Sequence, residues 1–281
     1  ALSVILGSAL GVILCFLLCK LANAGGKAVK TSQIGNRLAE MKDSKFFLLS
    51  FALIVLSFVP AYLAFYPGIC AYDTIYQLDQ AANNYFIEHH PLVHTLLLKS
   101  FFVLGRQVFA SAGVGITLYV ILQVLVLSAT FSCALTAVHH YRVKWYWQIL
   151  GIVYCVCYPF HHYLGVSVTK DVIFSAFFLL TMVLFFGELK AERNQWKVRG
   201  RDVLLLVGIV GIVLFRNNGK YALLVVVCFL LLALIGDKRN RSMWGRLLLV
   251  TGAALLVGQM ILTCVFRFSG AEQGDKREML S

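Results

Sequence analysis

The amino-acid sequence predicts an all-α fold, a polytopic transmembrane helix bundle. Hydrophobic residues make up 60% of the 281 positions, the mean hydropathy is +0.81, and only 14% of the residues are charged. Soluble domains carry about 25% charged residues, so this composition excludes a water-soluble globule. Apolar runs also recur at lengths near the roughly 20 residues that a helix needs to cross a bilayer.

About eight transmembrane helices are expected. A first helix and a basic loop occupy 1–45, and a single transmembrane module follows over 46–281. The stretch 92–104 is apolar but shorter than the others, so we do not count it as a crossing. The eight predicted segments are 2–19, 46–65, 113–138, 145–160, 172–187, 203–215, 221–236 and 247–266.

The distribution of lysine and arginine predicts the orientation. Alternate loops carry 17 of the 25 basic residues, and the positive-inside rule places such loops in the cytoplasm. The loop 66–112 then lies on the extracytoplasmic side, so we expect a multi-pass protein of the cell membrane with its polar chemistry outside. The four basic loops are 20–45, 139–144, 188–202 and 237–246.

Several functional classes are disfavoured. The formal charge of +12 could suit nucleic acid, but cytoplasmic loops account for it, so no nucleic-acid partner is expected. The sequence has no phosphate-binding loop of the GxxxxGK[ST] type and no GxGxxG motif. Seven of the eight cysteines fall in apolar segments, where small apolar side chains serve helix packing.

The segment from Phe65 to His94 gathers two aspartates, one glutamate and three histidines, without any lysine or arginine. Pro67 and Gly68 predict a turn at the end of a membrane helix. Asp73 is then expected to cap a short amphipathic helix on the membrane surface. Two interpretations stay open: Asp73 only caps, or its carboxylate sits in a partly desolvated cleft and acts as a general base.

Three histidines, His89, His90 and His94, flank Pro91. Pro91 suits the first position of a helix, which makes His90 a cap and puts His94 one turn above it. The spacing of four would suit a pair of metal ligands, but Pro91 biases His90 away from helical geometry and no HExxH motif is present. We therefore favour hydrogen bonding to a phosphate, sugar or carboxylate over a metal site; structural polarity is the alternative.

Two later stretches bring cations to the same side. In "VSVTKD", Ser167 or Thr169 can cap a helix, Asp171 suits its first turn, and Lys170 lies where an anionic phosphate is favoured. A lysine that only extends toward the interface is the alternative. In "FRNNGKY", Arg216 and Lys220 flank a turn made by Asn217, Asn218 and Gly219, and arginine can bind phosphate oxygens in a bidentate manner.

The strings "YPG…YDTIYQ", "HHPLVHTLLL", "TKDVIF" and "FRNNGKY" resemble those of a bacterial family of GT-C-like membrane proteins. The GT-C class comprises membrane glycosyltransferases that use polyprenyl-phosphate-linked sugars on the extracytoplasmic face. The resemblance covers 46–281 and implies that Asp73 is the catalytic base. Lys170 and Arg216 would contact the donor phosphate. Many members have a second carboxylate directly after the first, where this sequence has Thr74.

The resemblance implies transfer of a sugar from a polyprenyl-phosphate donor to a glycan, lipid or protein acceptor beside the lipid bilayer. A divalent cation is compatible with these residues but not required, and no metal ligands are assigned. The alternatives are a transporter or flippase for a lipid-linked or anionic solute, and a non-catalytic membrane subunit. We also expect both ends of the sequence to continue in a longer protein.

Overall fold

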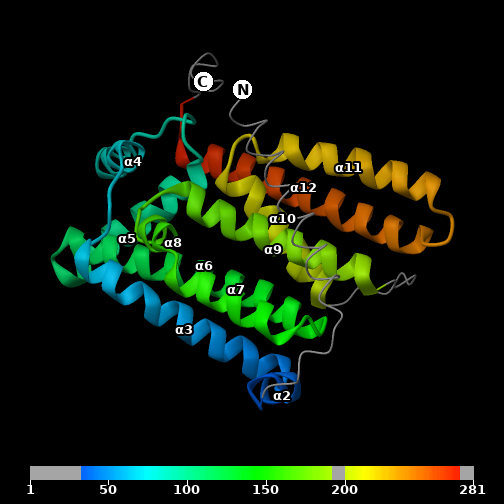
Figure 1. The fold of residues 1–281 in the computed structure, drawn as a ribbon. Coiled ribbons are helices and arrows are strands. Elements are labelled where there is room, and N and C mark those ends of the chain that lie inside the picture. Colours follow the sequence, from blue (N-terminus) through cyan, green and yellow to red (C-terminus); the bar gives the residue numbers. More distant parts are fainter. Residues whose placement is uncertain (1–32, 192–199, 273–281) are drawn as a thin grey trace, which may run out of the picture. The chain divides into compact units, whose positions relative to one another are not determined.

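A computed structural model describes residues 33–191 and 200–272. They form eleven helices and no strands, which confirms the all-α prediction (Figure 1). The first helix belongs to one compact unit, 1–41, and all others belong to a second, 42–281. The helices are α2 Gln33–Glu40, α3 Asp43–Ala64, α4 Tyr72–Asn83, α5 Leu92–Phe109, α6 Ala112–His140, α7 Trp145–Cys157, α8 Pro159–Gly165, α9 Lys170–Ala191, α10 Gly200–Phe215, α11 Gly219–Gly236 and α12 Arg241–Ser269.

The protein is a multi-pass membrane protein. Within the described residues, six helices are long and apolar enough to cross a bilayer: α3, α5, α6, α9, α11 and α12. The helices α7 and α10 are shorter, at 13 and 16 residues. The first predicted crossing, 2–19, lies outside the described part of the chain. The stretch 92–104 is longer than expected, because it belongs to the 18-residue helix α5.

The second unit has two ends that are defined by contacts between helices. At one end, Tyr62 of α3 donates a hydrogen bond to Thr117 of α6, at 3.1 Å. At the other end, Asp43 at the start of α3 lies 2.7 Å from Nδ1 of His140, the last residue of α6. The helices α3 and α6 are therefore antiparallel. We call these ends the Asp73 end and the Asp43 end.

The helix α5 stays within the Asp73 end. His94 in its first turn contacts Tyr119 of α6, and Gly105 near its end packs against Gly115 of α6. The two helices are antiparallel and joined at Ser111, whose side chain accepts a hydrogen bond from Val114 N–H and caps α6. Because α5 covers only the first part of α6, it does not reach the Asp43 end despite its length.

The helix α10 is the most enclosed of the apolar helices, with α9 and α12 packed on it (Figure 1). Its glycines allow this contact, since a Cβ on Gly211 would lie 2.3 Å from the ring of Phe177 in α9. By contrast, α11 has an apolar face that points outward, with Val225, Leu232 and Ile235 at least 70% exposed. An outward apolar face of this kind suits contact with lipid rather than water.

Candidate functional site at the Asp73 end

The backbone brings two distant loops together at the Asp73 end. Ile69, which follows α3, donates its N–H to the carbonyl of Val166, at 3.0 Å, and accepts from Val168 N–H, at 2.9 Å. The hydroxyl of Thr74 also donates to the carbonyl of Val168. These bonds connect the segment before α4 with the segment between α8 and α9. They therefore bring Asp73 and Lys170, which are 97 positions apart in the sequence, next to each other.

Gly68 is required for this approach. Its φ is +144°, a backbone conformation that residues with a side chain rarely adopt. A Cβ at this position would also lie 2.8 Å from the side chain of Val120 in α6. The prediction of a turn at Pro67 and Gly68 is therefore confirmed. Gln123 of α6 supports the neighbouring loop, because its amide donates to the carbonyls of Gly165 and Ser167 at 2.9 and 2.8 Å.

Asp73, Lys170 and His90 form the centre of the site. The Lys170 ammonium donates to Asp73 Oδ2 at 2.6 Å and lies 3.4 Å from His90 Nδ1. His90 Nδ1 is 3.9 Å from the same carboxylate oxygen. The Asp73 side chain is 49% exposed, whereas His90 and Lys170 are 7% and 19% exposed. The Asp73 carboxylate is thus accessible at the protein surface, and the Lys170 ammonium beside it is mostly covered.

The charges of this cluster follow from its environment. The hydrogen bond from Lys170 holds the pKa of the Asp73 carboxyl below its usual value, so Asp73 is ionised at neutral pH. Burial, reinforced by the nearby Lys170 charge, lowers the pKa of His90 to about 4. His90 is therefore neutral at pH 7, and its Nδ1 can accept a hydrogen bond from Lys170.

The helix ends differ in detail from those predicted. Asp73 is not a cap: Ala71 is the N-cap of α4, and Asp73 lies in its first turn without a capping bond. His90 is not a cap either, because Pro91 takes that position before α5. Ser167 donates to the carbonyl of Tyr163 and does not cap α9. In the first two cases no side-chain oxygen is used at the N-cap.

His94 lies behind the site rather than in it. It is fully buried, with Nδ1 3.0 Å from the Gln77 side chain and Nε2 2.7 Å from the Tyr119 hydroxyl. Gln77 in turn donates to the Thr95 hydroxyl at 2.9 Å. This network joins α4, α5 and α6, and it makes His94 a positioning residue for α4, which carries Asp73, and for the start of α5, which follows His90.

The predicted cations do not converge on one point. Arg216 donates to Asp171 at 3.0 Å, both about half exposed, and its guanidinium lies 5.0 Å from the Phe174 ring centroid. Asp171 follows Lys170 in α9, so the two ion pairs are neighbours. Asn217 donates to the carbonyl of Glu88 at 3.3 Å. Lys220 lies 5.4 Å from the Tyr221 ring centroid.

His89 lies next to His90, with ring centroids 4.7 Å apart. Its Nδ1 is buried without a hydrogen-bond partner within the described chain. No group of three or more histidine, cysteine, aspartate or glutamate side chains in residues 33–191 and 200–272 could hold a metal ion. His90 and His94 face different partners and do not form a ligand pair, so a divalent cation stays a prediction without described ligands.

A cavity of about 390 Å³ lies between α4 and α5 at the same end. Two cations line it, Lys99 and Arg106, together with the side-chain amides of Asn84 and Gln107. Lys99 and Arg106 each lie against a phenylalanine ring, at 4.9 and 5.7 Å from its centroid. Neither cation is among the site residues that the sequence predicted.

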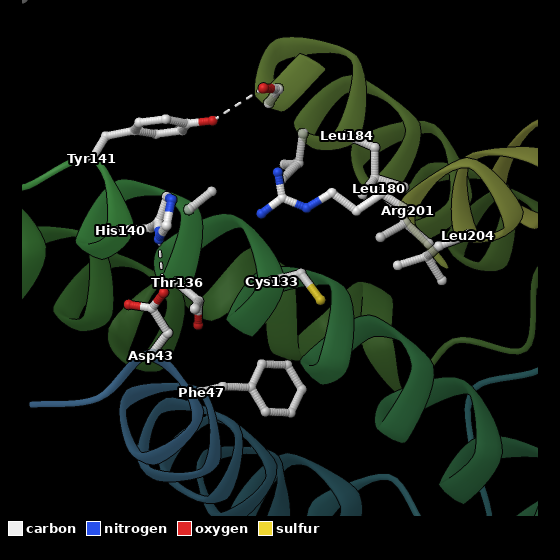
Figure 2. A pocket seen from close by; sticks show the side chains of 13 residues that line it. Asp43, Phe47, Cys133, Thr136, His140, Tyr141, Leu180, Leu184, Arg201 and Leu204 are labelled. Carbon is white, nitrogen blue, oxygen red and sulfur yellow. Dashed lines mark hydrogen bonds and ion pairs between the residues drawn. The ribbon is translucent and has the colours of Figure 1, made fainter. Parts of the chain in front are cut away.

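Charged residues at the Asp43 end were also missed by sequence reasoning. Arg246 of α12 is buried and pairs with Glu188 of α9 and, at 3.2 Å, with Asp202 of α10. A cavity lined by Asp43, His140 and Arg201 lies at this end too (Figure 2). All of these fall at or near the ends of apolar segments, so they looked like ordinary loop charges in the sequence.

The fold and the Asp73 cluster together define a multi-pass helical membrane protein with a carboxylate–ammonium–imidazole site in the link between its helices. No curated protein and no solved structure matches the chain. A family model does match, over residues 76–281, and the chain belongs to that family, described as "Family of unknown function (DUF6020)". The matched segment contains His90, Lys170 and Arg216 and begins three residues after Asp73.

Proposed function

We propose that the Asp73 end is the active site of a membrane glycosyltransferase that uses a polyprenyl-phosphate-linked sugar. One observation carries the proposal: Lys170 lies 2.6 Å from the exposed carboxylate of Asp73 and 3.4 Å from the neutral imidazole of His90. A base and a phosphate-binding cation are therefore adjacent. The resemblance of the loop and cation motifs to GT-C enzymes supports the same assignment.

The reaction is an inverting transfer. Asp73 takes the proton of an acceptor hydroxyl, whose oxygen forms the new bond to the anomeric carbon of the sugar. The bond between that carbon and the phosphate oxygen breaks, and the electron pair leaves with the polyprenyl phosphate. Lys170 stabilises the charge that develops on the leaving phosphate, the electrostatic effect that usually dominates enzymatic rate enhancement.

Lys170 also controls when Asp73 can act. The Lys170 ammonium lowers the pKa of Asp73, which makes the carboxylate a weak base. A donor phosphate carries negative charge and competes for the same ammonium. Donor binding would therefore draw Lys170 away and raise the basicity of Asp73 only when a sugar is present.

The acceptor side and the orientation are part of the same proposal. The Asp73 end belongs to the extracytoplasmic face, since 17 of the 25 basic residues fall in the alternate loops of the opposite side. Arg216 would provide a second cation near Lys170 if its ion pair with Asp171 opens. The cations Lys99 and Arg106, which line the cavity between α4 and α5, suit an acidic acceptor.

The test is a transfer assay with the Asp73→Asn variant in liposomes, using radiolabelled polyprenyl-phosphate hexose and pentose donors. Loss of a general base typically lowers the rate about 10²- to 10⁴-fold, so we expect a loss of at least about 100-fold. Asp79→Asn is the matched control, because Asp79 is an exposed carboxylate of the same helix that bonds only Asn83 among the described residues. Full transfer by Asp73→Asn would remove the base assignment.

A further inference from the structure

The cavity at the Asp43 end combines apolar walls with a few polar groups. It has a volume of about 190 Å³ and lies among α3, α6, α9 and α10 (Figure 2). Its walls include Phe47, Leu180, Leu184 and Leu204, so most of the lining is hydrocarbon. A small number of placed polar groups in a mainly apolar cavity is typical of a ligand site.

Arg201 is the cation of this cavity. Its guanidinium points into the space between α6 and α9, on the side of Tyr141 (Figure 2). It makes no hydrogen bond or ion pair with any residue of the described chain, whereas Tyr141 donates to the carbonyl of Gly187 at 3.4 Å. None of the five N–H donors of its guanidinium is used by residues 33–191 and 200–272.

The other charges around the cavity are already paired. Asp43 lies 2.7 Å from His140 Nδ1 and 3.7 Å from His139 Nε2. Behind the wall, Glu188 and Asp202 are both bound to the buried Arg246. Among the charged groups that line the cavity, the guanidinium of Arg201 is thus the one without a partner in residues 33–191 and 200–272. An anionic ligand would neutralise its charge.

The cavity opens toward two different surroundings. Leu204 is 40% exposed on an apolar helix, where lipid chains are expected. Asp43 and His140 are about half exposed at the helix ends, where the polar headgroups and water are expected. A ligand that fits both openings has a hydrocarbon part and an anionic part.

We propose that this cavity binds the phosphate headgroup of a membrane phospholipid, with Arg201 donating two hydrogen bonds to the phosphate oxygens. Arginine matches phosphate in this bidentate geometry. The acyl chains leave past Leu204 and lie against the apolar helices. The site is separate from the Asp73 cluster, and it holds whether or not that cluster transfers a sugar.

The test measures thermal unfolding of the purified full chain in detergent during titration with phosphatidylglycerol. A ligand that binds the folded state raises the midpoint as its concentration exceeds the dissociation constant. We expect phosphatidylglycerol to raise the midpoint and diacylglycerol, which has the same chains without phosphate, to have little effect. Equal stabilisation by the two lipids would overturn the proposal.

Variants assign the effect to this cavity. In Arg201→Gln, the lipid concentration that gives half of the shift should rise at least ten-fold. Arg241→Gln is the matched control, since it removes the same charge from an exposed position at the start of α12. Unchanged lipid dependence in Arg201→Gln would rule out the assignment.

A second variant keeps the guanidinium and closes the space. Leu204→Trp adds bulk to the wall at a partly exposed position and should also weaken the phosphatidylglycerol effect at least ten-fold, with the unliganded midpoint within a few degrees of the wild-type value. Glycerol phosphate, the soluble headgroup, should not replace the lipid. Equal stabilisation by glycerol phosphate would identify a free phosphate site and contradict a lipid occupant.

Discussion

At the scale of single residues, the basicity of Asp73 depends on Lys170. The ammonium lies 2.6 Å from the carboxylate, and it is much less exposed than its partner. A group with a depressed pKa in the folded state stabilises the protein above its unfolded pKa, about 3.9 for aspartate. That contribution is lost as the pH falls from the unfolded pKa through the folded pKa of Asp73, because the unfolded state binds more protons than the folded state in this range.

Lys170→Gln should therefore remove a pH-dependent part of the stability. The expected loss near pH 7 is no more than about 1 kcal/mol, since Asp73 is half exposed and the pair is screened by solvent. The difference between wild type and variant should shrink below pH 4. Thermal unfolding in detergent between pH 3 and pH 7 measures it. Arg216→Gln, which breaks the adjacent exposed pair, is the control, and a pH-independent difference for Lys170→Gln would contradict the argument.

Residue types alone identified part of the site. Asp73, His90 and Lys170 stood out as a carboxylate, an imidazole and a cation in a hydrophobic chain, and they meet. His94 also stood out, but the sequence does not show that Gln77 and Tyr119 would bury it. Partners such as these come from other helices, so the difference between a site histidine and a structural one depends on packing.

At the scale of elements, close helix contacts at glycine hold the Asp73 end together. A Cβ at Gly105 of α5 would lie 2.3 Å from the backbone nitrogen of Gly115 in α6. Backbone atoms cannot move aside as a flexible side chain can, so the two helices would have to separate. The network of Gln77, His94 and Tyr119 spans the same interface and would be strained with it.

Gly105→Ala should destabilise the protein by about 1–3 kcal/mol, the usual cost of overpacking. Gly252→Ala in α12 is the matched control, because nothing lies within 4 Å of a Cβ there. The control should be neutral or gain up to about 1 kcal/mol from the higher helix propensity of alanine. Chemical unfolding in mixed micelles gives both values. Equal stability of Gly105→Ala and wild type would show that α5 and α6 are not in close contact.

Helices were easier to predict than their ends. Periodicity and apolar runs found α4 and the long helices, because these signals extend over many residues. The caps of α4 and α5 were wrong, since Ala71 and Pro91 take positions that polar neighbours were expected to fill. A cap depends on one dihedral angle and one hydrogen bond, and a nearby Asp or His does not determine either.

At the scale of the whole molecule, the charged residues divide between the two ends of the second unit. The Asp73 end has the ion pairs of Lys170 and Arg216, and the Asp43 end has the buried Arg246 and the guanidinium of Arg201, which pairs with no residue of 33–191 and 200–272. Counting loop charges placed Arg201 and Arg246 in two of the basic loops that are predicted to be cytoplasmic. Arg246 turns inward to Glu188 and Asp202, whereas Arg201 stays exposed at the cavity, and the order of residues does not reveal this difference.

The central claim is that the Asp73 cluster acts on the extracytoplasmic side of the membrane, and cysteine labelling of intact cells tests it most directly. Tyr72→Cys lies next to Asp73 at a position that is 85% exposed, and Val143→Cys lies in the turn at the Asp43 end. With a membrane-impermeant maleimide and the native cysteines as background, we predict labelling of Tyr72→Cys in intact cells and of Val143→Cys only after lysis. Labelling of Val143→Cys in intact cells, with Tyr72→Cys protected until lysis, would contradict the account.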